Sequence, residues 1–165
     1  MADVKTPHRP LFLREEELRY SIELMFFAYR DFTGEADAML ESCDLGRAHH
    51  RVIYFVGRHP GINVSELLAI LNITKQSLSR VLSQLIEDGY IEQEQGTTDK
   101  RQRLLSLTSK GRDLEHDVTL IQRQRFAQAF KSVSGEAVTG FLAVMEAMLD
   151  EKTIPLLRRP PMTRI

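Results

Sequence analysis

The sequence predicts a mainly α-helical protein with a small β-sheet of two or three strands near its centre. Three observations in residues 61–111 support this fold class. Two short helical segments are joined by a tight turn, a glycine stands where the second helix must end, and two β-prone segments flank a charged loop. Long helical segments lie on either side of this centre, at 13–39, 45–58, 109–131 and from 134 onward.

Polar residues mark where the two central helices begin. Asn63 can cap the first helix, and Glu66 three residues later completes a capping-box pattern. We expect the buried side of that helix to consist of Leu67, Leu68, Ile70 and Leu71. Thr74 is a good N-cap for the second helix.

The second helix has the clearest periodicity in the chain. Its apolar residues fall at i, i+3, i+4, i+7 and i+8, and they are Leu78, Val81, Leu82, Leu85 and Ile86. The opposite side carries Gln76, Arg80 and Ser83, and no acidic residue occurs from 74 to 86. Such a face suits hydrogen bonding to base edges and phosphates, although taken alone a merely polar surface explains it equally well.

The segment that follows predicts a β-hairpin. Gly89 stands where a left-handed C-terminal cap belongs, strands are expected at 90–94 and 103–107, and the connecting loop is 95–102. Residues 97–112 contain five Lys or Arg and one Asp, a local charge of +4 in a chain whose net charge is −1. A two-helix unit followed by a cationic hairpin is the winged helix-turn-helix arrangement, which places a helix in the major groove and the hairpin against the adjacent backbone or minor groove.

Two motifs in this region resemble those of the MarR family of bacterial transcription regulators. Residues 99–111 (Asp-Lys-Arg-Gln-Arg-Leu-Leu-Ser-Leu-Thr-Ser-Lys-Gly) are similar to the family's wing signature, Asp-x-Arg followed by Leu-Thr-x-x-Gly. Residues 85–91 are similar to the family's Leu-x-x-x-Gly-hydrophobic-hydrophobic link between recognition helix and wing. The resemblance covers residues 46–111 by motif and the whole chain by helix order. It implies a homodimer that binds pseudo-palindromic promoter sites, commonly as a ligand-responsive repressor.

The resemblance also implies an organisation for the single domain, 1–165. Residues 45–111 are expected to be the DNA-binding winged helix, 13–44 and 112–154 the dimerisation helices, and 155–165 a tail without a helix. The first helix is apolar around much of its circumference, at Leu18, Tyr20, Ile22, Leu24, Met25, Phe26, Phe27, Tyr29 and Phe32. Such a helix needs more than one neighbour. A second subunit is the natural cover, and the chain's own C-terminal helices are the alternative.

The last helix is expected to turn one apolar side inward. The residues on that side are Val138, Phe141, Leu142, Met145, Met148 and Leu149.

The expected DNA contacts come from the second central helix and from the hairpin. On the helix they are Lys75, Gln76, Ser77, Ser79, Arg80 and Ser83, with Gln76 and Arg80 the best candidates for base edges. On the hairpin the resemblance implies that Asp99 orients Arg101, that Arg101 enters the minor groove, and that Lys100 and Arg103 hold phosphates.

A small-molecule effector is a further implication of the resemblance. In this family an acidic or aromatic ligand commonly binds between the reading unit and the dimerisation helices. The candidate ligand-binding residues near that junction are Tyr29, His49, His50, Arg51 and Tyr54.

Redox and metal sensing are the alternatives within the same fold. Cys43 is the single cysteine, and the carboxylates of Glu41 and Asp44 nearby disfavour its thiolate. A metal cluster of Glu41, Cys43, His49 and His116 is conceivable across helices, but the chain has no Cys-x-x-Cys or His-x-x-x-His motif. The sequence therefore predicts no metal and no cofactor.

Several other classes are disfavoured. No uncharged apolar run approaches 18 residues and no signal peptide is evident, so we expect a cytoplasmic protein without a membrane partner. No catalytic motif occurs, so we do not expect an enzyme. A winged-helix protein-interaction module without DNA binding would have a neutral or acidic hairpin and acidic residues on its second helix. An activator or architectural protein without an effector is equally compatible with the sequence.

Overall fold

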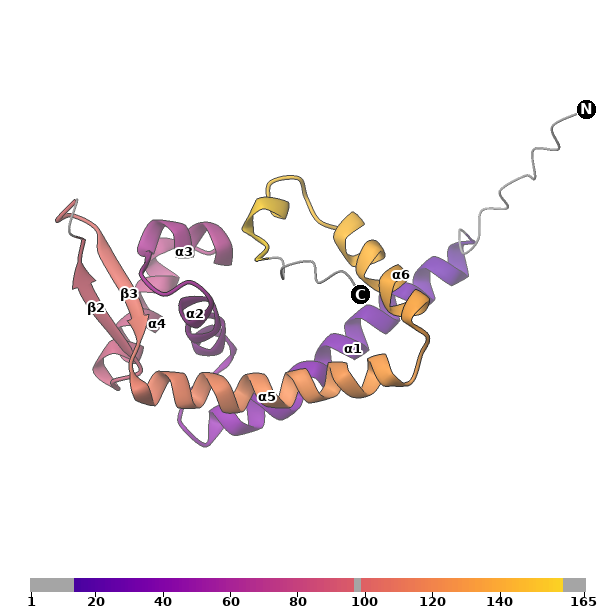
Figure 1. Ribbon diagram of the computed structural model, residues 1–165, viewed down its shortest axis with the longest axis horizontal. Coiled ribbons are helices and arrows are strands. Elements are labelled where there is room, and N and C mark those ends of the chain that lie inside the picture. The colour runs from indigo at the N-terminus through magenta and orange to yellow at the C-terminus, as the bar shows by residue number, and fades with distance from the viewer. Residues whose placement is uncertain (1–13, 97–98, 159–165) are drawn as a thin grey trace, which may run out of the picture.

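The computed structural model describes residues 14–96 and 99–158. It is mainly helical with one small sheet, which confirms the predicted fold class (Figure 1). The elements in order are α1 (Glu15–Glu41), α2 (Arg47–Arg58), β1 (Ile62–Asn63), α3 (Val64–Leu71), α4 (Lys75–Glu87), β2 (Ile91–Gln95), β3 (Arg103–Leu107), α5 (Ser109–Lys131), α6 (Gly135–Ala147) and η1 (Ile154–Leu156). We call α2, α3, α4 and the sheet the head, and we call α1, α5 and α6 the arm.

The sheet has three antiparallel strands in the order β1-β3-β2. The hairpin pairs Ile91 with Leu107 and Gln95 with Arg103, so its two strands lie where the sequence predicts them. The two-residue strand β1 pairs Ile62 with Leu105 and makes β3 the central strand. Sequence reasoning did not locate β1, because two residues are too few to show an alternating pattern.

The predicted capping residues are confirmed. Asn63 Oδ1 accepts the Glu66 N–H at 3.0 Å, and Glu66 Oε2 accepts the Asn63 N–H at 3.0 Å, which completes the capping box. Thr74 caps α4 by accepting the Ser77 N–H at 3.2 Å. These side chains pair the amides that a helix N-terminus leaves without partners, a contribution of about 1 kcal/mol per cap.

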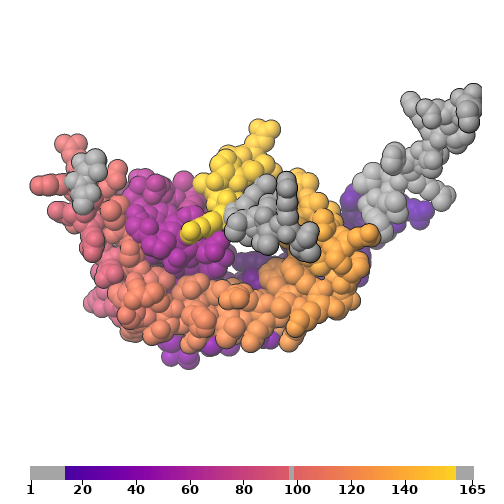
Figure 2. Space-filling model, in the orientation of Figure 1, coloured from indigo at the N-terminus to yellow at the C-terminus, as the bar shows by residue number. Residues whose placement is uncertain are grey.

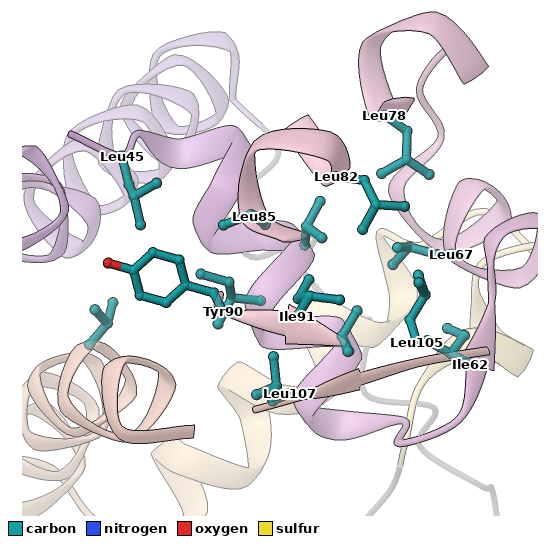
Figure 3. Packing of buried hydrophobic residues seen from close by; sticks show 14 of the residues in the cluster. Leu45, Ile62, Leu67, Leu78, Leu82, Leu85, Tyr90, Ile91, Leu105 and Leu107 are labelled. Carbon is teal, nitrogen blue, oxygen red and sulfur yellow. The ribbon is translucent and has the colours of Figure 1, made fainter. Parts of the chain in front are cut away.

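The core of the head lies between α4, α3, α2 and the sheet (Figure 3). The predicted apolar stripe of α4 is confirmed, because Leu78, Leu82 and Leu85 are buried and Val81 and Ile86 are partly buried. Other core residues come from the remaining elements and include Leu40, Leu45, Val52, Ile53, Val56, Ile62, Leu67, Tyr90, Ile91, Leu105, Leu107 and Val118. Burying each leucine contributes about 1.5–3 kcal/mol, so this packing fixes α4 on the sheet through its apolar side and leaves its polar side outward.

The end of α4 joins the hairpin through a Schellman motif. The Gly89 N–H donates to the Ile86 carbonyl at 3.1 Å, and the Tyr90 N–H donates to the Leu85 carbonyl at 2.8 Å. Gly89 has φ +78°, a left-handed conformation that glycine adopts without steric cost, as the sequence predicts. Because Leu85 and Tyr90 are both buried, the turn is anchored in the core.

The start of α5 packs directly on the same turn. The Thr108 hydroxyl donates to the Gly89 carbonyl at 2.6 Å and accepts the Gly111 N–H at 3.1 Å as the N-cap of α5. A Cβ placed on Gly111 would overlap the Tyr90 carbonyl oxygen. A side chain at this position would therefore force α5 away from the hairpin, which gives the Leu-Thr-x-x-Gly pattern a physical reason.

The arm extends away from the head along α5, with α1 beside it (Figure 1). Phe32 and Phe126 pack at 5.3 Å between ring centroids, and Arg125 pairs with Glu35 at 2.9 Å. Beyond η1 the chain returns to the head, where the Arg158 guanidinium donates to the Arg58 carbonyl and Arg58 Nη2 lies 3.4 Å from the Arg158 carbonyl oxygen. The short 3-10 turn η1 includes Pro155, and residues 159–165 of the expected tail lie outside the described residues.

The expectation that α6 turns an apolar side inward is confirmed only in part within this chain, because Val138 and Met145 are half-buried and the Phe141 ring packs on Phe130 at 6.1 Å between centroids. No residue of α6 is buried, and Phe141, Leu142 and Met148 are 42%, 50% and 64% exposed. The first half of α1 is also uncovered, since Ile22 and Phe26 are 69% and 63% exposed. The chain's own helices therefore do not provide the cover that the apolar faces of the arm require. Within 14–96 and 99–158 no helix is long and apolar enough to cross a membrane.

Gly111→Ala is predicted to lower the free energy of unfolding by about 1–3 kcal/mol, because its methyl group must displace the Tyr90 carbonyl or the start of α5. Gly34→Ala is the control, since a Cβ at this helical position meets nothing within 4 Å. Urea unfolding at one fixed protein concentration measures both changes. A Gly111→Ala variant as stable as the Gly34→Ala variant would contradict the described junction.

Candidate nucleic-acid interface

The polar side of α4 is an open surface without acidic groups. Lys75, Gln76, Ser79, Arg80 and Ser83 are exposed and line a shallow depression. Ser77 is exposed too, but its hydroxyl oxygen lies 2.9 Å from the hydroxyl of the capping Thr74. Five of the six predicted contact residues therefore share one accessible face. Lys75, the first of them, stands at the helix N-terminus, where the helix dipole favours an anion.

The hairpin carries the second predicted set. Asp99 Oδ1 accepts the Arg101 N–H at 2.9 Å, and the Asp99 carbonyl accepts the Gln102 N–H at 3.0 Å. Asp99 therefore contacts the backbone of Arg101 and holds the turn, and Arg101 itself is exposed. Thr97 and Thr98, which belong to the same predicted loop, lie outside the described residues.

The five cations near the hairpin fall into two groups. Lys100, Arg101 and Arg103 are exposed, and they form no ion pair with the residues that the structure describes. Lys110 Nζ, in contrast, donates to the Asp88 carbonyl at 2.8 Å and lies 4.1 Å from the centroid of the Tyr90 ring. Only part of the local positive charge predicted from sequence is thus free to meet a ligand.

Arg112 belongs with Lys110 in the engaged group. Its guanidinium donates to the Leu107 carbonyl at 2.7 Å and to the Ser109 hydroxyl at 2.9 Å. Both cations stabilise the junction between α4, β3 and α5. The free cations instead lie on the hairpin, which projects at the end of the molecule remote from α6 (Figure 2).

The candidate effector residues fall into separate pairs. Arg51 Nη2 donates to the Tyr29 hydroxyl at 3.1 Å and joins α2 to α1, while the His50 and Tyr54 rings lie 6.4 Å apart between centroids. His49 faces the other way and contacts α4, so the structure does not bring all five residues together.

His50 is the most unusual of these residues. Its Nε2 is buried and has no hydrogen-bond partner among the described residues. Burial lowers the pKa of His50, and Arg51 adds to this effect, while the Asp37 and Glu115 carboxylates oppose it. Burial therefore favours the neutral form of this ring, which lies close to the Asp37 and Glu115 carboxylates of α1 and α5.

The residues considered for sensing are on the surface or apart from one another. Cys43 is an exposed free cysteine whose sulfur lies 3.8 Å from the Ser42 hydroxyl. The described ranges contain no group of three or more His, Cys, Asp or Glu side chains placed to hold a metal ion.

Comparison with known proteins decides the family. The family model described as "MarR family" matches residues 44–102. The helix-turn-helix transcriptional regulator PetP of Rhodobacter capsulatus is 48% identical over 96% of this chain and 95% of its own length. The chain belongs to the MarR family. The transcriptional regulator BilQ of Clostridium symbiosum is 31% identical over 49% of this chain and 56% of its own length. The family consists of transcriptional regulators and is not a class of enzymes.

Solved structures of MarR-type proteins share the fold. FabT of Streptococcus pneumoniae, crystallised in complex with DNA, matches 79% of this chain and 94% of its own chain with a TM-score of 0.72 at 19% identity. The crystal structure of MarR itself matches 79% of this chain and 93% of its own chain with a TM-score of 0.58 at 22% identity. These likenesses confirm the winged helix-turn-helix architecture.

One contact of α4 lay beyond sequence reasoning. Gln84 is half-buried and its Oε1 lies 2.8 Å from His49 Nε2, although the two residues are 35 positions apart. In the sequence Gln84 reads as one more polar residue beside Ser83, and His49 as one of two adjacent histidines. No local pattern joins them, so only the three-dimensional packing of α2 on α4 identifies the pair.

Proposed function

We propose that this MarR-family protein is a homodimer that binds pseudo-palindromic sites in double-stranded DNA and represses transcription until a small ligand binds. The observation that carries the proposal is the acid-free polar face of α4 beside a hairpin with three free cations, both fixed to one core. A protein-interaction module has no need of this combination, whereas a DNA reader needs both a groove-reading face and phosphate contacts.

In the proposed complex, α4 lies in the major groove. Arg80 and Gln76 have the geometry to form bidentate contacts with guanine and adenine edges, and Lys75 and the α4 N-terminus meet a phosphate. The hairpin lies against the neighbouring minor groove, where a guanidinium at Arg101 responds to groove width, and Lys100 and Arg103 neutralise phosphates. FabT, a protein of the same fold, was crystallised in complex with DNA, which supports DNA binding by this chain.

The proposed dimer uses the uncovered apolar faces of the arm. Contiguous exposed apolar surface on a protein of this size marks an interaction site. The large exposed side chains on α1, α5 and α6 include Leu18, Tyr20, Ile22, Leu24, Met25, Phe26, Phe27, Leu120, Phe126, Phe141, Leu142 and Val144. A second copy that covers residues 13–44 and 112–154 would leave each 45–111 unit free and would set the separation of the two α4 helices.

The proposed effector site is the junction of α1, α2 and α5. Arg51 supplies donors for a carboxylate, Tyr29 and Tyr54 supply aromatic surface, and His50 supplies a buried nitrogen without a partner among the described residues. An acidic aromatic ligand suits this chemistry. By separating or closing α1 and α2, such a ligand would change the distance between the two α4 helices and so the fit to two half-sites.

Arg80→Ala is predicted to weaken binding to a specific duplex by about 5- to 150-fold, because one bidentate base contact contributes about 1–3 kcal/mol of discrimination. The same change should reduce the preference for the specific duplex over a scrambled one. Fluorescence anisotropy measures both affinities, with Arg158→Ala, an exposed cation after η1, as the control. Unchanged affinity and unchanged preference in the Arg80→Ala variant would show that α4 does not read bases.

Arg101→Ala is predicted to lower affinity for specific and scrambled duplexes alike. It should also reduce the slope of log affinity against log salt by about 1 for each phosphate that the hairpin no longer neutralises. Lys110→Ala removes the same formal charge from the engaged group, so its slope should equal that of the unmodified protein. Titrations between low and moderate salt give the slopes. Equal slopes for Arg101→Ala and Lys110→Ala would contradict the assignment of the hairpin to DNA.

A further inference from the structure

A continuous chain of hydrogen bonds ties α4 to the turn between α1 and α2. The Gly46 N–H donates to His49 Nδ1 at 3.1 Å, and His49 Nε2 lies 2.8 Å from Gln84 Oε1. The Gln84 amide nitrogen then donates to the Asp44 carbonyl at 3.5 Å. This series of hydrogen bonds starts in the turn at Gly46, crosses to α4 through His49 and Gln84, and ends in the turn at Asp44. We call it the hydrogen-bond chain.

The Gly46 N–H and the Asp44 carbonyl, at the two ends of the hydrogen-bond chain, determine the donor and the acceptor in each of its hydrogen bonds. The Asp44 carbonyl only accepts, so the Gln84 NH₂ must face it and the Gln84 oxygen must face His49. The Gly46 N–H only donates, so His49 Nδ1 carries no proton and Nε2 carries one. In this arrangement Nδ1 of His49 accepts and its Nε2–H donates to Gln84, so both ring nitrogens are used.

The turn between α1 and α2, which contains both Asp44 and Gly46, is held by its own backbone hydrogen bonds. Asp44 has φ +58° and closes α1 in a Schellman motif, with Asp44 N–H donating to the Glu41 carbonyl at 3.1 Å and Leu45 N–H to the Leu40 carbonyl at 3.0 Å. Leu40 and Leu45 are buried. The Asp44 carbonyl is thus held at the end of the arm helix α1. The hydrogen-bond chain therefore joins the arm directly to α4.

We propose that His49 and Gln84 are positioning residues that set the rotation of α4 relative to the arm, and thereby the alignment of the two reading faces in the dimer. This inference rests on the proposed function. The other contacts between α2 and α4 are largely apolar, and apolar packing is not directional, whereas hydrogen bonds depend on angle. Gln84 stands one turn after Arg80, so a rotation at Gln84 is passed directly to the reading face.

Two substitutions separate this role from simple helix capping. His49→Asn keeps an oxygen that can accept the Gly46 N–H but is too short to reach Gln84. Gln84→Leu keeps the bulk of the side chain and removes both of its hydrogen bonds. If His49 only capped α2, His49→Asn would behave like the unmodified protein. Ala69→Leu, at an exposed position of α3 outside the proposed interfaces, controls for an added surface leucine.

The readout is affinity for duplexes with different half-site spacing. On the natural spacing, His49→Asn and Gln84→Leu are each expected to weaken binding by about 3- to 10-fold, the range for loss of one or two hydrogen bonds. The double variant should bind DNA no more weakly than either single variant, because both substitutions break the same hydrogen-bond chain. On duplexes with one base pair added or removed, the variants should discriminate less than the unmodified protein, since α4 is less constrained.

Three results would overturn the proposal. Effects that multiply in the double variant would show that the two residues act independently. Unchanged discrimination between spacings would show that the pair does not align α4. A His49 ring whose nitrogen chemical shifts indicate Nδ1–H, or do not respond to Gln84→Leu, would contradict the hydrogen-bond chain itself. This last measurement needs no DNA, so it separates failure of the chain from failure of the proposed DNA function.

Discussion

The backbone junction formed by Gly89, Tyr90, Thr108 and Gly111 is the constraint that positions every other part of the structure. The left-handed turn at Gly89 ends α4 and starts β2, and the Thr108 hydroxyl binds the Gly89 carbonyl. The missing side chain of Gly111 allows α5 to begin against the same turn. Helix α4, the hairpin and α5 therefore meet at one junction. This junction fixes the position of the head relative to the arm.

Two kinds of uncompensated surface follow from this arrangement. On the head they are polar: the acid-free face of α4 and the cations of the hairpin that form no ion pair within the described residues. On the arm they are apolar, and no residue of α6 is buried. An isolated chain satisfies neither surface. The proposed two-fold dimer on DNA would satisfy both, because the arms would cover each other while the heads would face the phosphates. The hydrogen-bond chain through His49 and Gln84 connects the head, with its polar surface, to the arm, with its apolar surface.

Features set by local sequence were predictable, and features set by distant contacts were not. The stripe from Leu78 to Ile86, the caps at Asn63 and Thr74 and the turn at Gly89 depend on residues a few positions apart, and all were confirmed. The partners of Lys110 and His49 come from other elements, so a charge count treated Lys110 as free and a polar pattern hid the contact of His49. The sequence indicated an apolar side of α6 without indicating what covers it, because amphipathicity shows that a face is buried and not by which chain.

Everything proposed for the dimer depends on whether the paired α4 faces read DNA sequence. Fluorescence anisotropy of the unmodified protein with the DNA upstream of its own gene, against a scrambled duplex of equal length and across a range of salt concentrations, answers that question. We expect tighter binding to the upstream duplex, one dimer per site and a steep fall of affinity with salt. Absence of binding to either duplex at low salt would contradict a DNA-reading role for α4.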